Sequence, residues 1–256
     1  MTRPPALAVR FAGGRRAPKR HRLVWGALAV LVFAGFIQLG NWQVRRLDWK
    51  LKLIADVRSR VHASPVAAPG PGEWPRIGAG HDRYLHVRAT GTYLNTDETL
   101  VRGTSRLGYG FWLMTPLRTD RGFIVLVNCG YLPSALPEST SFRTLKRPTG
   151  EVTITGLLRL TEPGGGFLRP NRPAKGLWYS RDVAAIAAAK GLPAGTVAPY
   201  FIDADAQPEQ KGWPVGGLTV IHFPNHHLGY AITWYLMALA TAICAFVAAR
   251  NERQRT

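Results

Sequence analysis

The stretch Asn225-His226-His227-Leu228-Gly229-Tyr230-Ala231-Ile232-Thr233-Trp234 decides the fold, because it opens a long uncharged segment near the C-terminus. The twenty residues from 230 to 249 carry no charge, and Leu, Ile, Met, Ala, Phe and Val predominate among them. A helix needs about 20 such residues to cross a bilayer. His, Tyr and Trp at its start and arginines after its end are typical of membrane–water boundaries. We predict a transmembrane helix over 226–249 and a cytoplasmic tail over 250–256.

A second uncharged run covers residues 23–40 and is interrupted only by Gln38. A cleaved signal peptide is the alternative interpretation, and Val32-Phe33-Ala34 offers a cleavage site. The apolar core of a signal peptide is usually shorter, about 7–15 residues. We therefore predict an uncleaved transmembrane helix over 23–40.

The distribution of charge sets the expected orientation. The chain has 256 residues and a net charge of +18, of which residues 1–22 and 249–256 together carry +9. Basic tails beside apolar segments are typical of cytoplasmic flanks, and the remaining charge forms no concentrated stripe, which argues against nucleic-acid binding. We therefore predict a cytoplasmic tail over 1–22 and a central segment outside the cytoplasm. A composition rich in Ala, Gly, Pro and Arg suggests a bacterial source, and hence the inner membrane and a periplasmic domain.

Between the two spans the pattern changes from helix to strand. Residues 41–75 are predicted as a helical extension to about Arg60 followed by a Pro/Ala/Gly-rich linker, and residues 76–225 as a β-rich domain. The predicted strands cover 84–94, 99–102, 110–117, 123–127, 152–160 and 200–202, and a short Ala-rich helix covers 182–190. The expected fold is a membrane protein in which two transmembrane α-helices flank a mostly antiparallel β (α+β) extracytoplasmic domain.

The chemistry-bearing residues concentrate at the ends of the spans. His222, His226 and His227 are the residues that could hold a cofactor, because imidazole is a common axial ligand of haem iron. His227, Tyr230 and Trp234 share one helical face. The alternative is that these histidines are anchors at the headgroups. Familiar nucleotide-binding, hydrolase and metalloprotease motifs do not occur in the sequence.

A similar cluster follows the first span. Trp42, Arg46 and Trp49 also share a helical face, with Lys50 beside them. Tryptophan with arginine and lysine at a membrane exit has a simpler explanation as an interfacial anchor.

Two motifs resemble the Surfeit locus protein 1 family. They are Gly40-x-Trp42-Gln43-x-x-Arg46-x-x-Trp49-Lys50 and Asn225-x-His227-Leu228-x-Tyr230-Ala231-x-x-Trp234. Between them, residues 110–117 and 127–133 look like the central hairpin of that family. Cys129 replaces the usual arginine there and Tyr131 the usual tryptophan, so a role carried by that arginine is in doubt.

The resemblance implies an assembly factor for haem–copper terminal oxidases, chiefly cytochrome c oxidase, acting as a chaperone in respiratory-chain biogenesis without turnover of its own. It also implies binding of haem a and delivery to oxidase subunit I, in contact with the haem a synthesis machinery and membrane lipid. Two alternatives stay open: a membrane-anchored periplasmic binding module for a peptide or lipid, and a membrane enzyme.

Within the family, the histidine that heads the second span is the candidate haem ligand, which here is His227. We expect Tyr230 and Trp234 to line the same face, with Trp42 and Trp49 opposite. Arg46 and Lys50 would meet the propionates, because cations pair well with carboxylates. His226 points about 100° away on an ideal helix and is the weaker candidate.

Overall fold

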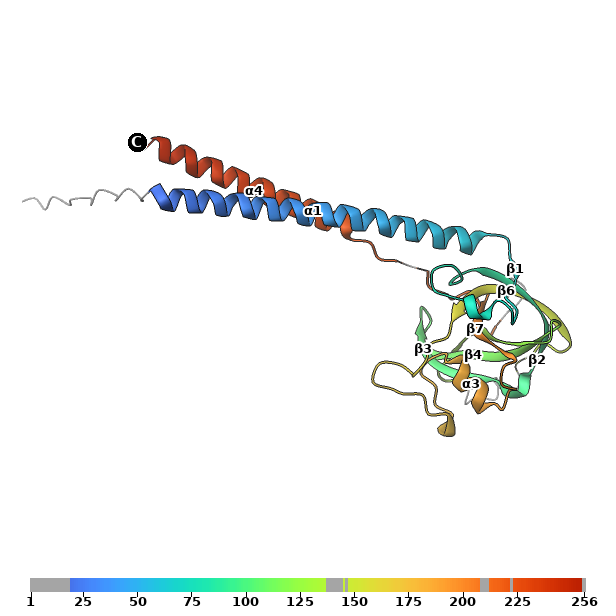
Figure 1. Ribbon diagram of the computed structural model, residues 1–256. Helices are drawn as coiled ribbons and strands as arrows, with labels where there is room; N and C mark the ends of the chain where they lie inside the picture. The colour runs from blue at the N-terminus through green and yellow to red at the C-terminus, as the bar shows by residue number, and fades with distance from the viewer. Residues whose placement is uncertain (1–18, 137–144, 146, 208–211, 222, 255–256) are drawn as a thin grey trace, which may run out of the picture. The chain divides into compact units, whose positions relative to one another are not determined.

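The computed structural model describes residues 19–136, 145, 147–207, 212–221 and 223–254. Most of the predicted basic tail and His222 lie outside the described residues. The chain divides into two compact units (Figure 1). One contains the residues up to Lys52 and those from Pro224 on, and the other is Leu53–Phe223.

Two helices contribute to the first unit, and the last residues of the first helix belong to the second unit. Helix α1 runs over Lys19–His62 and α4 over His227–Gln254, and both are long and apolar enough to cross a membrane. Helix α1 continues past the predicted span because no proline follows until Pro65 and good helix formers predominate. Helix α4 starts after Asn225, whose side-chain oxygen accepts a hydrogen bond from the backbone N–H of His227 at 3.4 Å. Helix α1 therefore contains the predicted first span and the helical extension, and α4 begins one residue after the predicted start of the second span.

The second unit is built on one sheet of seven strands among the described residues. The strands are β1 Val66–Ala67, β2 His86–Tyr93, β3 Thr99–Ser105, β4 Gly108–Thr119, β5 Ile124–Pro133, β6 Glu151–Leu160 and β7 Val197–Ala204. Their order is β1-β2-β6-β7-β5-β4-β3, and the additional pairing of β2 with β4 closes a barrel. Only β1–β2 and β5–β7 pair in parallel, so the predicted mostly antiparallel domain is confirmed.

Alternation along the strands produces two apolar layers. One core cluster contains Leu117, Val125 and Tyr200 and fills the barrel. A second contains Met114, Phe201 and Ile186, the last contributed by helix α3 (Val183–Ala189), which covers the other face of the sheet. Asp182 caps α3 by accepting from Ala185 N–H at 3.1 Å. Three short 3-10 helices complete the described elements: η1 Trp74–Arg76, η2 Asn95–Asp97 and η3 Pro173–Lys175.

The segment expected to be a linker packs onto the barrel. Strand β1 lies within it, and Ala68 is only 2% exposed. The Pro69 carbonyl accepts from the Tyr200 hydroxyl at 2.7 Å, and the Ala68 carbonyl accepts from Arg121 Nη1 at 2.6 Å. Small residues and prolines allow this extended chain to pack closely against the barrel. The segment whose Pro/Ala/Gly composition predicted a linker is therefore a fixed edge of the barrel.

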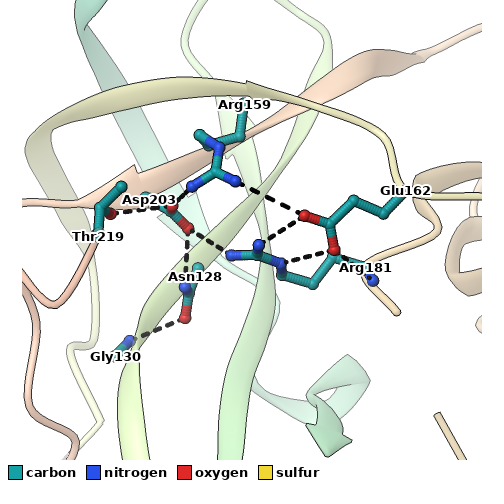
Figure 2. A network of polar contacts seen from close by, with 7 residues as sticks. All are labelled: Asn128, Gly130, Arg159, Glu162, Arg181, Asp203 and Thr219. Atoms are coloured by element: carbon teal, nitrogen blue, oxygen red, sulfur yellow. Dashed lines mark hydrogen bonds and ion pairs between the residues drawn. The ribbon is translucent and has the colours of Figure 1, made fainter. Parts of the chain in front are cut away.

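A buried polar network joins three neighbouring strands (Figure 2). Asp203 on β7 is 3% exposed, and its carboxylate accepts four hydrogen bonds. The donors are Asn128 Nδ2 at 2.8 Å on β5, Arg159 Nη1 at 2.9 Å on β6, Arg181 Nη1 at 3.2 Å and Thr219 Oγ1 at 2.9 Å. A buried carboxylate is tolerated only when it is paired and hydrogen-bonded in this way.

The same network closes the base of the loop between β6 and α3. Arg181 Nη2 donates to Glu162 Oε1 at 2.6 Å, and Glu162 N–H donates to the Arg181 carbonyl at 3.1 Å. Although burial opposes ionisation of Glu162, the guanidinium of Arg181 holds the pKa of that carboxyl below its ordinary value. The two ends of the loop are thereby fixed to each other and, through Asp203, to the barrel.

We expect Asp203→Ala to destabilise the barrel by about 3–5 kcal/mol, because it leaves two largely buried guanidinium groups to share Glu162. Asp120→Ala is the matched control. That carboxylate is exposed, so its loss should change the free energy of unfolding by less than about 0.5 kcal/mol. Urea unfolding of the detergent-solubilised protein, followed by near-ultraviolet circular dichroism, measures both. Equal midpoints for the two variants would show that the network contributes nothing to stability.

Candidate functional site

The residues that form the contact between α1 and α4 recur along each helix at intervals of three and four positions or their sum. On α4, Ala231 and Ala238 are 2% and 1% exposed although the helix is largely exposed elsewhere. On α1, Gly40 and Gln43 are buried. Small residues at such positions allow two helices to approach closely, which is the usual way that transmembrane helices associate.

Aromatic side chains fill the contact around Gly40. The Tyr235 ring lies over this glycine, and a Cβ atom there would be 2.6 Å from Tyr235 Cε1. The Tyr235 hydroxyl donates to Asn41 Oδ1 at 2.8 Å. Phe36 and Trp234 stack with ring centroids 5.7 Å apart. Gly40 therefore sets the distance between the helices, and the aromatic rings set their register.

His227 lies at the first position of α4 and is oriented by α1. Its Nδ1 is 2.7 Å from Oε1 of Gln43, a side chain that is 8% exposed. An amide oxygen only accepts, so Nδ1 carries the proton and the lone pair of the neutral ring is on Nε2. Among the hydrogen bonds of the described residues, His227 Nε2 takes part in none. The ring thus has a fixed tautomer and one available nitrogen.

The other predicted residues of α4 have different surroundings. His226 precedes the helix and is exposed, and its carbonyl accepts from Tyr230 N–H at 3.2 Å. Tyr230 is 57% exposed, one turn after His227. Trp234 is half-buried by its stacking on Phe36. Of the three aromatic and imidazole residues predicted on one face, His227 and Trp234 contact α1, and Tyr230 is exposed.

The predicted residues of α1 lie on a neighbouring face of their helix. Trp42 and Trp49 are 50% and 49% exposed, and the Arg46 guanidinium carbon is 4.2 Å from the Trp49 ring centroid. On an ideal helix Trp42 is rotated by about 100° from Gln43. The structure therefore places Gln43, rather than Trp42 or Trp49, against His227. Lys50 is partly buried and follows Gln43 by two turns.

Sequence reasoning assigned no role to Gln43, Asn41 or Tyr235 at this contact. A signal was present, because Phe36, Gly40 and Gln43 are spaced as one helical face. A glutamine on an otherwise apolar face that continues a membrane span needs a partner, since an unpaired buried amide is costly.

The two departures from the family hairpin lie in the barrel. Tyr131 is fully buried, its hydroxyl donates to the Gly108 carbonyl at 2.6 Å, and its ring packs edge-on against Trp112 at 4.9 Å. Cys129 lies beside Tyr93 and Thr115 in a cavity of about 430 Å³. Burial raises the pKa of its thiol to about 11, so the thiol stays protonated near neutral pH. Tyr131 has a structural role, and Cys129 lacks the charge that an arginine would bring.

The fold and this contact define a class: a barrel domain that lies in the sequence between two helices that can span a membrane, with an oriented histidine at the start of the second helix. Residues 30–239 match the family model described as the SURF1 family, and the chain belongs to that family. It is therefore a membrane-anchored protein. The chain is 36% identical over 227 residues to Surfeit locus protein 1 of Rattus norvegicus, which covers 81% of this chain and 70% of the relative.

Other relatives agree with this assignment. Surfeit locus protein 1 of Mus musculus is 34% identical over 85% of this chain and 73% of its own length. The protein of the same name from Homo sapiens is 34% identical over 92% of this chain and 80% of its own length. The family resemblance inferred from the paired motifs is thus confirmed.

We expect Gly40→Ala to weaken the pairing of α1 with α4 by about 1–3 kcal/mol, because the added methyl group displaces the Tyr235 ring and its hydrogen bond to Asn41. Gly35→Ala is the matched control. No atom lies within 4 Å of a Cβ at Gly35, so that change should be neutral or stabilising.

A donor–acceptor dye pair on the exposed side chains at Val24 and Val247 reports separation of the helices during titration with sodium dodecyl sulfate. The expected result is a lower midpoint for Gly40→Ala only. Identical midpoints for the two alanine variants would contradict the close approach at Gly40.

Proposed function

We propose that this protein is an assembly factor for haem–copper terminal oxidases, chiefly cytochrome c oxidase, without catalytic turnover of its own. In this proposal it binds haem a transiently at His227 and passes it to oxidase subunit I. Family membership supports the assembly role. The observation that carries the haem proposal is the 2.7 Å hydrogen bond between His227 Nδ1 and the buried Gln43 Oε1.

This hydrogen bond suits a histidine that would hold haem iron. Histidines that bind metals usually donate their other ring N–H to an acceptor, which fixes the tautomer and the ring orientation. Haem supplies four equatorial nitrogens of its own, so one imidazole from the protein suffices to hold its iron. His227 meets this requirement with Nε2, and Gln43 is the residue that holds the imidazole in position.

The other predicted residues carry side chains whose chemistry suits the rest of the ligand. Tyr230, Trp42 and Trp49 offer aromatic surface to an apolar macrocycle, and burial of that surface would contribute most of the affinity. Arg46 is exposed beside Trp49, and guanidinium groups pair well with carboxylates such as the propionates. Trp234 and Lys50 would support this surface from the helix contact, and His226 is an exposed alternative ligand.

The proposed setting is the bacterial inner membrane, with both tails in the cytoplasm and the barrel in the periplasm. Two helices that can span the membrane and the basic residues of both tails support this topology. Its partners would be subunit I, the haem a synthesis machinery and membrane lipid, without nucleic acid. A periplasmic binding module is the second candidate function, favoured by the cavity beside Cys129.

We expect His227→Ala to lose most of the haem that co-purifies with the wild-type protein when haem a synthesis is co-expressed, because the imidazole that would hold the iron is removed. His226→Ala is the matched control and should keep its haem and an unshifted Soret band. In a strain lacking the gene, the oxidase should regain haem a in reduced-minus-oxidised membrane spectra with His226→Ala and not with His227→Ala.

The outcomes separate the two parts of the proposal. Wild-type haem content in purified His227→Ala would make the ligand assignment wrong and leave His227 as a helix anchor. Unchanged oxidase spectra after deletion of the gene would contradict the assembly role itself and favour the binding module.

We expect Gln43→Leu to weaken haem binding by about 10-fold or more, because His227 then loses the acceptor that fixes its tautomer. Gln43→Glu should retain binding and lower the reduction potential of the iron, because a carboxylate acceptor increases the electron density of the imidazole. Gln38→Leu, at an exposed position of the same helix, should change neither property.

Haem titration and spectroelectrochemistry measure these effects. If Gln43 only stabilised the helix contact, Gln43→Glu would weaken the pairing of the two helices and leave the reduction potential of the iron unchanged. That result would contradict the positioning role.

A further inference from the structure

The loop between β6 and α3 presents two neighbouring apolar side chains to solvent. Phe167 is 92% exposed and Leu168 is 85% exposed, the highest values of any large hydrophobic side chains in the described part of the chain, those of α1 and α4 included. Scattered apolar residues on a surface are ordinary, but an adjacent pair with almost no contacts needs an explanation.

The backbone holds this pair at the tip of a tight turn. Gly166 N–H donates to the Arg169 carbonyl at 2.9 Å, and Arg169 N–H donates to the Gly166 carbonyl at 3.1 Å. Leu168 has a φ of 57°, in the left-handed region that glycine or asparagine occupies at least cost. Turn chemistry would therefore not select leucine at this position, which indicates a contact outside the barrel.

The loop behind the tip is well fixed. Asn171 Oδ1 accepts from the backbone N–H groups of Tyr179 and Ser180 at 2.8 and 3.2 Å. Ser180 Oγ accepts from Gly165 N–H at 3.0 Å. At the base, the Glu162–Arg181 pair and Asp203 tie the loop to the barrel (Figure 2). The tip is consequently a preformed projection, so little order has to be created when it meets a partner.

Between Glu162 and Asp182, the acidic residues at its two ends, the loop carries charges of one sign. Residues 163–181 contain four basic and no acidic side chains. Arg181 is paired with Glu162, while Arg169, Arg172 and Lys175 are exposed and form no ion pair among the described residues. The Arg169 guanidinium lies 5.8 Å from the Tyr179 ring centroid. An apolar tip is thus bordered by three cations.

We propose that Phe167 and Leu168 insert into the interfacial region of an anionic phospholipid bilayer, with Arg169, Arg172 and Lys175 contacting lipid phosphates. Apolar side chains beside lysine and arginine are the combination that binds proteins to such surfaces. The barrel domain is joined to a helix of the membrane-anchored unit at both of its ends, at residues 52/53 and 223/224. Because the barrel domain is connected at both ends to the membrane-anchored unit, lipid is present near it at a high effective concentration. A small contact area is then enough for binding. The proposal is independent of haem.

Depth-dependent quenching tests the proposal on the full chain. The environment-sensitive dye NBD is attached at Phe167→Cys in a Cys244→Ala background, and the protein is reconstituted into nanodiscs that contain acyl-chain-brominated lipid. NBD at Leu107→Cys is the matched control, because Leu107 is an exposed leucine in the β3–β4 turn. The Cys244→Ala parent, labelled in parallel, reports any reaction at Cys129.

In discs with phosphatidylglycerol, we expect quenching at residue 167 to exceed that at residue 107 by at least threefold, with a blue-shifted emission. The excess should fall in phosphatidylcholine discs, in Leu168→Gly and in the combined Arg169→Gln, Arg172→Gln and Lys175→Gln variant. Equal quenching at the two positions in both lipids would overturn the proposal. So would a photo-crosslinker at residue 167 that, in cells, forms its adducts with a protein rather than with lipid.

Discussion

The contact between α1 and α4 obeys one constraint: polar side chains buried between two packed helices have to satisfy one another, because an unpaired buried polar group is costly. The pairs Gln43–His227 and Asn41–Tyr235 do so at 2.7 and 2.8 Å across the two helices. Such bonds contribute about 1 kcal/mol each, so close packing at Gly40, Ala231 and Ala238 has to accompany them. Packing brings the helices together, and the polar pairs specify which residues face one another.

The barrel also contains a buried polar group that has to be satisfied, but it satisfies this group with several donors on one carboxylate. Its interior is apolar, and its outer layer contains a carboxylate that is almost fully buried, Asp203. Two arginines, an asparagine and a threonine converge on that one carboxylate (Figure 2). Because these donors come from β5, β6, the segment before α3 and the segment after β7, the network fixes loops that no strand pairing holds. The Phe167–Leu168 projection depends on this anchoring.

The outline of the fold could be predicted from sequence, because uncharged runs and alternating strands are local signals. The two spans, the strands 84–94 and 152–160 and the helix near 182–190 all correspond to observed elements. Strand order could not be predicted, since the parallel pairing of β5 with β7 joins segments more than sixty residues apart. The fixed edge at residues 66–70 was also missed, because its Pro/Ala/Gly composition is shared with flexible linkers.

For the candidate site, sequence patterns identified His227 and did not identify its partner. Which residue of α1 faces His227 depends on the rotation of that helix about its axis, and one position along the helix changes this by about 100°. Trp42 and Gln43 are adjacent, yet the tryptophan is half exposed and the glutamine is buried against the imidazole. In this rotation Gly40 faces the Tyr235 ring, and a Cβ atom there would be 2.6 Å from Tyr235 Cε1. The close approach at Gly40 and the hydrogen bond between Gln43 and His227, three positions further along α1, are therefore parts of one helix contact.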